Sequence, residues 1–163
     1  MALTKLSTGI LADSAVTTAK LASNANAPTA TKFASAPAFS VTPNAVQSVT
    51  LNTWTKIALQ LEEYDTSNAF DAVTNFRFTP NVAGYYAITG CVSFTTSSTI
   101  ASYIYKNGAQ YRFGSYVTGY SSNVSAVIYL NGTTDYVELY GFTGATQNAT
   151  VSSYFNGVLV KPA

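Results

Sequence analysis

The residues of this sequence best suited to chemistry are four carboxylates in one short stretch, Glu62, Glu63, Asp65 and Asp71. Paired carboxylates catalyse glycoside hydrolysis, and clustered carboxylate oxygens bind Ca²⁺. No second acidic group lies clearly opposite this cluster, and the central Gly and terminal Glu of a calcium-binding loop are missing. We therefore favour a solvated loop over a catalytic or Ca²⁺ site and expect no metal.

Histidine and cysteine limit the chemistry further. The chain has no histidine, the commonest general base and the commonest metal ligand. Cys91 is the only cysteine, so it cannot form an intrachain disulfide. Its place in a predicted strand favours a small buried side chain over a reactive thiol. We therefore predict that the protein is not an enzyme and carries no cofactor.

The composition indicates a β protein with few charges. Charged residues make up 9% of the chain and the net charge is +1, so no electrostatic footprint for nucleic acid or an anionic membrane is present. The 12 Tyr and 9 Phe favour pleated sheets. A net charge near zero favours association, so we expect contact with other chains.

No targeting signal or membrane segment is recognisable in the sequence. The N-terminus lacks a basic region followed by an apolar stretch, and no apolar run reaches the length of a membrane span. We therefore expect synthesis in a reducing compartment, without a secretion signal.

Residues 1–37 differ from the rest of the chain. They contain a single aromatic residue, Phe33, and too little apolar surface for a core of their own. Residues 24–37 have the composition of an extended linker. The segment is either a flexible tail or an arm that a neighbouring subunit or partner orders. Its apolar residues include Leu3, Leu6, Ile10, Leu11, Val16 and Leu21.

Residues 38–163 alternate between apolar and polar side chains with the period of β-strands. In the strand that follows Gly84, the core face is Tyr86, Ile88, Val92 and Phe94. Its opposite face is Tyr85, Ala87, Thr89 and Cys91.

Turn signals separate these strands. Asn107-Gly108 is a strong hairpin signal. Residues 97–99 suggest a polar turn, and residues 114–123 suggest an exposed loop that carries Tyr116 and Tyr120. Eight to ten short strands at this spacing indicate a β-sandwich or barrel.

Four motifs occur in order within residues 38–163. They are Ala83-Gly84-Tyr85-Tyr86, Tyr105-Lys106-Asn107-Gly108, Leu130-Asn131-Gly132 with Asp135-Tyr136-Val137-Glu138-Leu139, and Phe155-Asn156-Gly157-Val158-Leu159. The series resembles the C1q-like globular domain of the C1q and tumour necrosis factor superfamily. One departure is Thr134, where that family usually has Gly.

The resemblance implies an all-β jelly-roll sandwich of about ten strands and a homotrimer packed about a threefold axis. The uncharged strand face supports a subunit interface, since interface cores are depleted in charge. We therefore expect Tyr85, Ala87, Thr89 and Cys91 at the trimer interface. A solvent face of small polar residues is the alternative.

The arm has a resemblance of its own. Ala12-Asp13-Ser14-Ala15-Val16-Thr17-Thr18-Ala19-Lys20-Leu21 is similar to Val-Thr-Thr-Ala-Lys-Leu segments of bacteriophage tail-fibre and other virion appendage proteins. Together with a C1q-like head, it indicates a phage structural protein made in the host cytoplasm and placed in the virion.

Our leading functional hypothesis is a trimeric capsid decoration or cement protein, or a head spike. The six apolar arm residues would bind the major capsid protein or another virion protein, and the jelly rolls would project outward as a knob.

The alternative is a receptor-binding tip of a tail fibre or baseplate. There Tyr116 and Tyr120, with Tyr140 and Phe142, would stack on a host surface glycan. Their alternative role is packing at sheet ends or between subunits.

Overall fold

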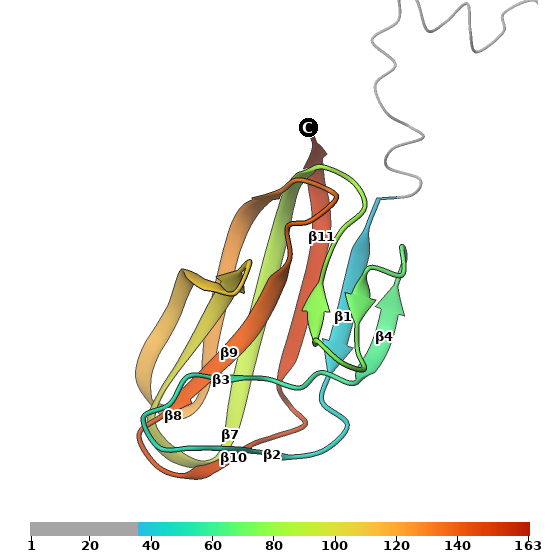
Figure 1. Ribbon diagram of the computed structural model, residues 1–163. Coiled ribbons are helices and arrows are strands. Elements are labelled where there is room, and N and C mark those ends of the chain that lie inside the picture. The colour runs from blue at the N-terminus through green and yellow to red at the C-terminus, as the bar shows by residue number, and fades with distance from the viewer. Residues whose placement is uncertain (1–35) are drawn as a thin grey trace, which may run out of the picture. The chain divides into compact units, whose positions relative to one another are not determined.

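The computed structural model describes residues 36–163, so the six arm residues predicted to anchor the chain lie outside the described range. Residues 36–163 belong to one compact unit. The described part consists of strands and connecting segments (Figure 1). The strands are β1 (Ala38–Thr42), β2 (Gln47–Val49), β3 (Thr55–Lys56), β4 (Leu61–Asp65), β5 (Phe70–Asp71), β6 (Arg77–Phe78), β7 (Gly84–Lys106), β8 (Ala109–Leu130), β9 (Val137–Thr143), β10 (Gln147–Ala149) and β11 (Tyr154–Pro162).

Two long antiparallel strands organise the fold. β7 has 23 residues and β8 has 22, and they pair along most of their length. Their pairing shifts register between Ser93 and Ser98, where both strands bend. This bend lets each strand contribute its two halves to two different layers of the sandwich.

Layer one has the strand order β4-β1-β11-β7-β8, built with the first half of β7 and the second half of β8. Layer two contains the other halves of β7 and β8, with β9 beside β7 and β3 and β6 beside β9. All of these pairs are antiparallel. The short β2 and β10 pair with each other at one end of the sandwich.

Two segments predicted as turn and loop are strand instead. Residues 97–99 lie inside β7, and residues 114–123 lie inside β8. Their small polar side chains resemble turn composition, but their backbone groups pair across the hairpin, as in Ser98 with Gly119. These polar stretches mark the bend between layers and not a reversal of the chain.

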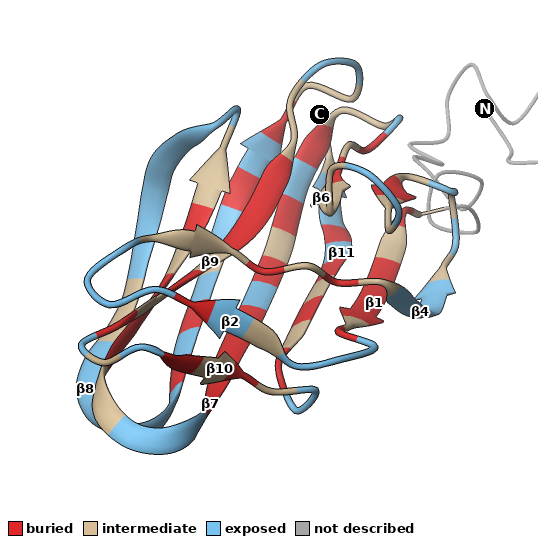
Figure 2. Cartoon of the chain, turned by 60° about the horizontal axis from the view of Figure 1, so that its bottom comes forward, coloured by how far each residue is buried: buried red, intermediate tan, exposed pale blue. Residues whose placement is uncertain are grey.

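The core lies between the two layers. Tyr86, Ile88, Val92 and Phe94 are all buried, which confirms the predicted core face of β7. Figure 2 shows buried and exposed residues alternating along the long strands. On β11, the side chains of Phe155 and Leu159 are buried by the same alternation.

The predicted Asn107-Gly108 hairpin is confirmed. These two residues join Lys106 to Ala109, and both have positive φ, 53° for Asn107 and 77° for Gly108. Two successive positive φ values are typical of the two-residue turn that matches the twist of paired strands. The turn therefore holds β7 and β8 in register.

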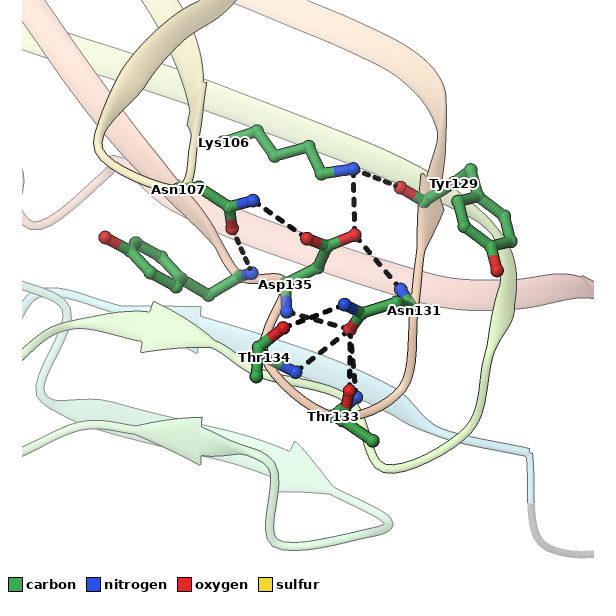
Figure 3. Close-up of polar contacts among 8 residues, drawn as sticks. Lys106, Asn107, Tyr129, Asn131, Thr133, Thr134 and Asp135 are labelled. Atoms are coloured by element: carbon green, nitrogen blue, oxygen red, sulfur yellow. Dashed lines mark hydrogen bonds and ion pairs between the residues drawn. The ribbon is translucent and has the colours of Figure 1, made fainter.

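A polar network ties this hairpin to the segment between β8 and β9 (Figure 3). Asp135 accepts hydrogen bonds from the Asn107 side chain (2.8 Å) and the Asn131 backbone (3.1 Å), and its carboxylate lies 2.9 Å from Lys106 Nζ. Lys106 Nζ also donates to the backbone oxygen of Tyr129 at 2.8 Å. The network therefore joins the end of the layer-two strands to the end of β8 in layer one.

The segment between β8 and β9 also explains why Thr134 can stand where the C1q-like family usually has Gly. The positive φ of this turn, 73°, falls on Gly132, where a Cβ atom would collide with the backbone of Ala83. Thr134 has no positive φ, and its backbone N–H donates to Asn131 Oδ1 at 2.9 Å. Glycine is therefore required at 132 and not at 134.

Candidate assembly interface

The predicted interface residues lie on the outer side of layer one. Tyr85 is 45% exposed, Thr89 is exposed and Ala87 is half-buried. Cys91 is only 6% exposed, and its Sγ lies 3.6 Å from Ser93 Oγ. Three of the four residues can therefore touch a partner. Cys91 is the small buried side chain that the sequence predicted, and it offers a partner little surface.

Neighbouring strands extend this surface with residues that were not predicted. Val127 (60% exposed) and Tyr129 (42%) come from β8, and Val158 (45%) and Val160 (51%) come from β11. We call these four, with Tyr85, Ala87 and Thr89, the layer-one face. The rings of Tyr85 and Tyr129 lie 5.5 Å apart, centroid to centroid.

Strand alternation in the sequence could have identified some of these additional residues of the layer-one face. Val127 and Tyr129 alternate with core residues of β8, and Val158 alternates with core residues of β11, so each points away from the core. The pairing of Ala87 with both Val127 and Val158 brings the three strands together. Only this register shows that the exposed apolar side chains form one surface.

A shallow groove of about 670 Å³ adjoins the layer-one face. Ala87, Thr89 and Val158 form part of its lining, together with Tyr64 and Asn156. Asn156 Oδ1 is buried and has no hydrogen-bond partner among the described residues. Since this oxygen is not accessible from outside, the groove offers a partner its apolar wall and exposed polar side chains such as Thr89.

The first half of β8 forms a free edge. Within the described residues β8 pairs only with β7, so its other side carries unpaired backbone groups. Tyr116 and Tyr120 are each 61% exposed on this strand, which confirms their predicted exposure. An unprotected edge favours contact with another chain.

The acidic stretch builds local structure. Asp71 accepts hydrogen bonds from the backbone N–H groups of Thr74 and Val73 and from the Asn75 side chain, at 2.6–3.0 Å. These bonds, the one from Thr74 first, lower the pKa of Asp71 to about 2. Asp65 accepts from backbone N–H groups of residues 67, 69 and 70 in the same manner.

The predicted acidic loop is partly strand, because Glu62, Glu63 and Asp65 lie in β4. Among residues 36–163, no three His, Cys, Asp or Glu side chains group as metal ligands. That same part of the chain contains no helix long and apolar enough to cross a membrane.

The two antiparallel layers, joined by long strands that pass through both, define a jelly roll of the tumour necrosis factor type. A crystal structure of murine APRIL superimposes with a TM-score of 0.61 and 13% identity, covering 77% of this chain and 99% of that one. Eiger TNF from S. frugiperda superimposes with a TM-score of 0.56 and 12% identity, covering 78% and 93%. The predicted jelly-roll fold is confirmed.

Identity this low establishes a shared fold and nothing about activity. The sequence matches no protein-family model and no curated protein.

Proposed function

We propose that the protein is a bacteriophage virion structural protein, a trimeric capsid decoration or cement protein or a head spike. The observation that carries its trimeric assembly is the layer-one face, whose seven members include no charged side chain, and the virion assignment rests on the resemblance of residues 12–21 to tail-fibre segments. Exposed apolar patches on soluble proteins mark sites of interaction. Side-by-side packing of three jelly rolls would cover this face.

The free edge of β8 and the groove support assembly as well. A stable interface buries roughly 1,200–2,000 Å² in total, more than one strand face can supply. The layer-one face, the adjoining groove and the edge that the second half of β8 forms in layer one supply neighbouring surfaces. A partner of the same sequence can present this edge to the face of its neighbour, which leaves Tyr116 in the first half of β8 uncovered.

Trimerisation would also serve the arm. The proposed capsid contacts of one arm are a few large apolar side chains, Leu3, Leu6, Ile10, Leu11, Val16 and Leu21. Three linked arms raise the effective concentration of each at the capsid, so avidity exceeds the affinity of one arm by about 10²–10⁴. The proposed capsid partner is the major capsid protein or another virion protein.

The test combines oligomeric state with capsid binding. Light scattering on the full chain should give three times the chain mass, and the protein should co-sediment with capsids lacking it. A variant lacking residues 1–23 should remain trimeric and lose capsid binding. Undiminished capsid binding by this variant, or a monomer at micromolar concentration, would contradict the proposal.

The second candidate is a receptor-binding tip of a tail fibre or baseplate. The exposure of Tyr116, whose ring contacts Phe113 and Phe142, favours it, because exposed tyrosines can stack on sugars. Tyr120 is equally exposed but contacts no other ring among the described residues, so we do not assign it to this role. Immunogold labelling distinguishes the two: many copies on the head support decoration, and few copies at the tail support a tip.

A further inference from the structure

Seven aromatic side chains form a connected set of ring contacts on the outer side of layer two, and we call them the aromatic face. β7, β8 and β9 contribute two rings each, and Trp54 precedes β3. The set is Trp54, Tyr103, Tyr105, Phe113, Tyr116, Tyr140 and Phe142.

Strand register places these rings in rows across the sheet. Tyr103 is opposite Phe113 on one side and Tyr140 on the other. One row along, Ala101 is opposite both Tyr116 and Phe142. The rings of Tyr116 and Phe142 lie 6.4 Å apart, with buried Ala101 between them in the row. A small residue between two large ones leaves a broad, shallow aromatic platform.

The platform is anchored on one side and open on the other. Trp54 packs against Tyr103 at 5.2 Å and against Phe142 at 5.3 Å, and its own side chain is half-buried. Phe113 is 48% exposed and Tyr116 is 61% exposed. Large aromatic surface is therefore open to solvent although each ring contacts another.

One ion pair and one arginine lie beside the aromatic face, and the guanidinium carbon of Arg112, which precedes Phe113, is 5.3 Å from the ring centroid of Tyr111. Lys56 Nζ lies 2.8 Å from Glu138 Oε1 and also donates to the Asn75 backbone oxygen at 3.1 Å. Glu138 is only 3% exposed. A nucleic acid or another polyanion needs a positively charged groove beside its stacking rings. A single arginine is no such groove, so the complementary ligand for this face is uncharged.

We propose that the aromatic face binds a neutral saccharide. The C–H groups on the apolar side of a sugar ring match the negative π faces of Tyr and Phe, and the phenol hydroxyls of Tyr103, Tyr116 and Tyr140 can donate to and accept from sugar hydroxyls. The face lies on the opposite side of the sandwich from the layer-one face. Binding therefore does not depend on how the chain attaches to a particle, and it fits a surface protein that touches host glycans.

The chain contains its own reporter, because Trp54 is the only tryptophan. The experiment titrates the full-length protein with maltohexaose, cellohexaose and N-acetylchitohexaose, followed by screening on an array of neutral glycans. A saccharide that stacks on the face should change Trp54 emission saturably, and calorimetry should give the same dissociation constant.

Two equally exposed tyrosines of β8 provide a matched pair of variants. Tyr116 belongs to the aromatic face, whereas Tyr120 lies outside its set of ring contacts. Tyr116→Ala should raise the dissociation constant about tenfold, as expected for the loss of one stacked ring, and Tyr116→Phe should retain most of the affinity. Tyr120→Ala should leave the constant within about twofold.

Three results would overturn the proposal. The first is no binding to any neutral glycan of the array. The second is equal loss of affinity in Tyr116→Ala and Tyr120→Ala, at unchanged melting temperature. The third is that acrylamide quenches Trp54 only after the oligomer dissociates, which would assign the face to a contact between copies. None of these results bears on capsid binding by the arm, so this proposal and the virion proposal fail separately.

Discussion

The two outer faces of the sandwich differ although the same two strands build both. On layer one, β7 and β8 expose Tyr85, Val127 and Tyr129, and β11 adds valines. On layer two, the other halves of β7 and β8 expose aromatic rings that contact one another. Since β7 and β8 cross from one layer to the other, each strand carries two surfaces of different chemistry. Valine and tyrosine suit close packing against protein, whereas an open row of rings suits a flat ligand.

The substitution with the largest expected effect disrupts the layer-one face and leaves the aromatic face intact. Val127→Asp places a charge on a surface that a partner would cover, and an unpaired buried charge costs about 3–5 kcal/mol. We expect light scattering to show a monomer, with saccharide binding at the aromatic face retained. Val73→Asp is the matched control, because Val73 is 85% exposed and lies outside the layer-one face. A trimer that tolerates Val127→Asp would contradict the assignment.

The substitution with the second largest expected effect crowds the core beneath the layer-one face. A Cβ atom on Gly157 would lie 2.5 Å from Ile88 Cδ1 and 2.6 Å from Phe39 Cε1. Gly157→Ala should therefore lower the free energy of unfolding by about 1–3 kcal/mol, measured by urea denaturation. Gly119→Ala is the control, because a Cβ there meets nothing within 4 Å. Equal losses in both variants would show that crowding is not the cause.

A third prediction compares one tyrosine from the core with one from the aromatic face. Burial raises the pKa of Tyr86 to about 12, and burial followed by the charge of Glu138 raises the pKa of Tyr140 to about 12. Because each folded-state pKa lies above the ordinary value of 10.0, the associated stability is complete below pH 10 and is lost as the pH rises through 12.

Phenylalanine variants show how much of the stability lost at alkaline pH comes from each tyrosine. Tyr86→Phe also removes the hydrogen bond from its hydroxyl to the Val82 backbone oxygen (2.7 Å), worth about 1 kcal/mol at neutral pH. Urea denaturation between pH 8 and 11.5 should show a shallower loss for Tyr86→Phe, and a smaller change for the more exposed Tyr140→Phe. An unchanged slope in Tyr86→Phe would contradict the prediction.

The substitution with the smallest expected effect tests the polar network around Asp135, which joins the two layers. The Asn107 side chain, and then Lys106, lower the pKa of Asp135. Stability from this carboxylate is therefore present above its ordinary pKa of 3.8 and is lost as the pH falls below it. Asp135→Asn should cost about 0–1 kcal/mol at pH 7 and flatten the acid limb of the pH profile. A destabilisation that persists unchanged at pH 2 would contradict an electrostatic cause.

Local sequence signals predicted the parts of the fold that depend on neighbours in the chain. The alternation around Tyr86 and the positive-φ pair Asn107-Gly108 both follow from side-chain period and turn chemistry, and both were confirmed. Residues 97–99 and 114–123 were wrongly predicted to interrupt strands. Their composition suits turns, but most of their residues pair between β7 and β8.

The sequence by itself determined which side chains leave the core, because successive residues of a strand point to opposite faces. It placed Tyr85 and Thr89 outside in this way, whereas Tyr116 was expected outside only as part of a predicted loop. Only the tertiary structure decided which of these outward side chains meet. Tyr85 reaches Tyr129 and Tyr116 reaches Phe142 through strand order and register, which join residues distant in the sequence. Surfaces formed by several strands therefore depend on long-range pairing, which no local pattern specifies.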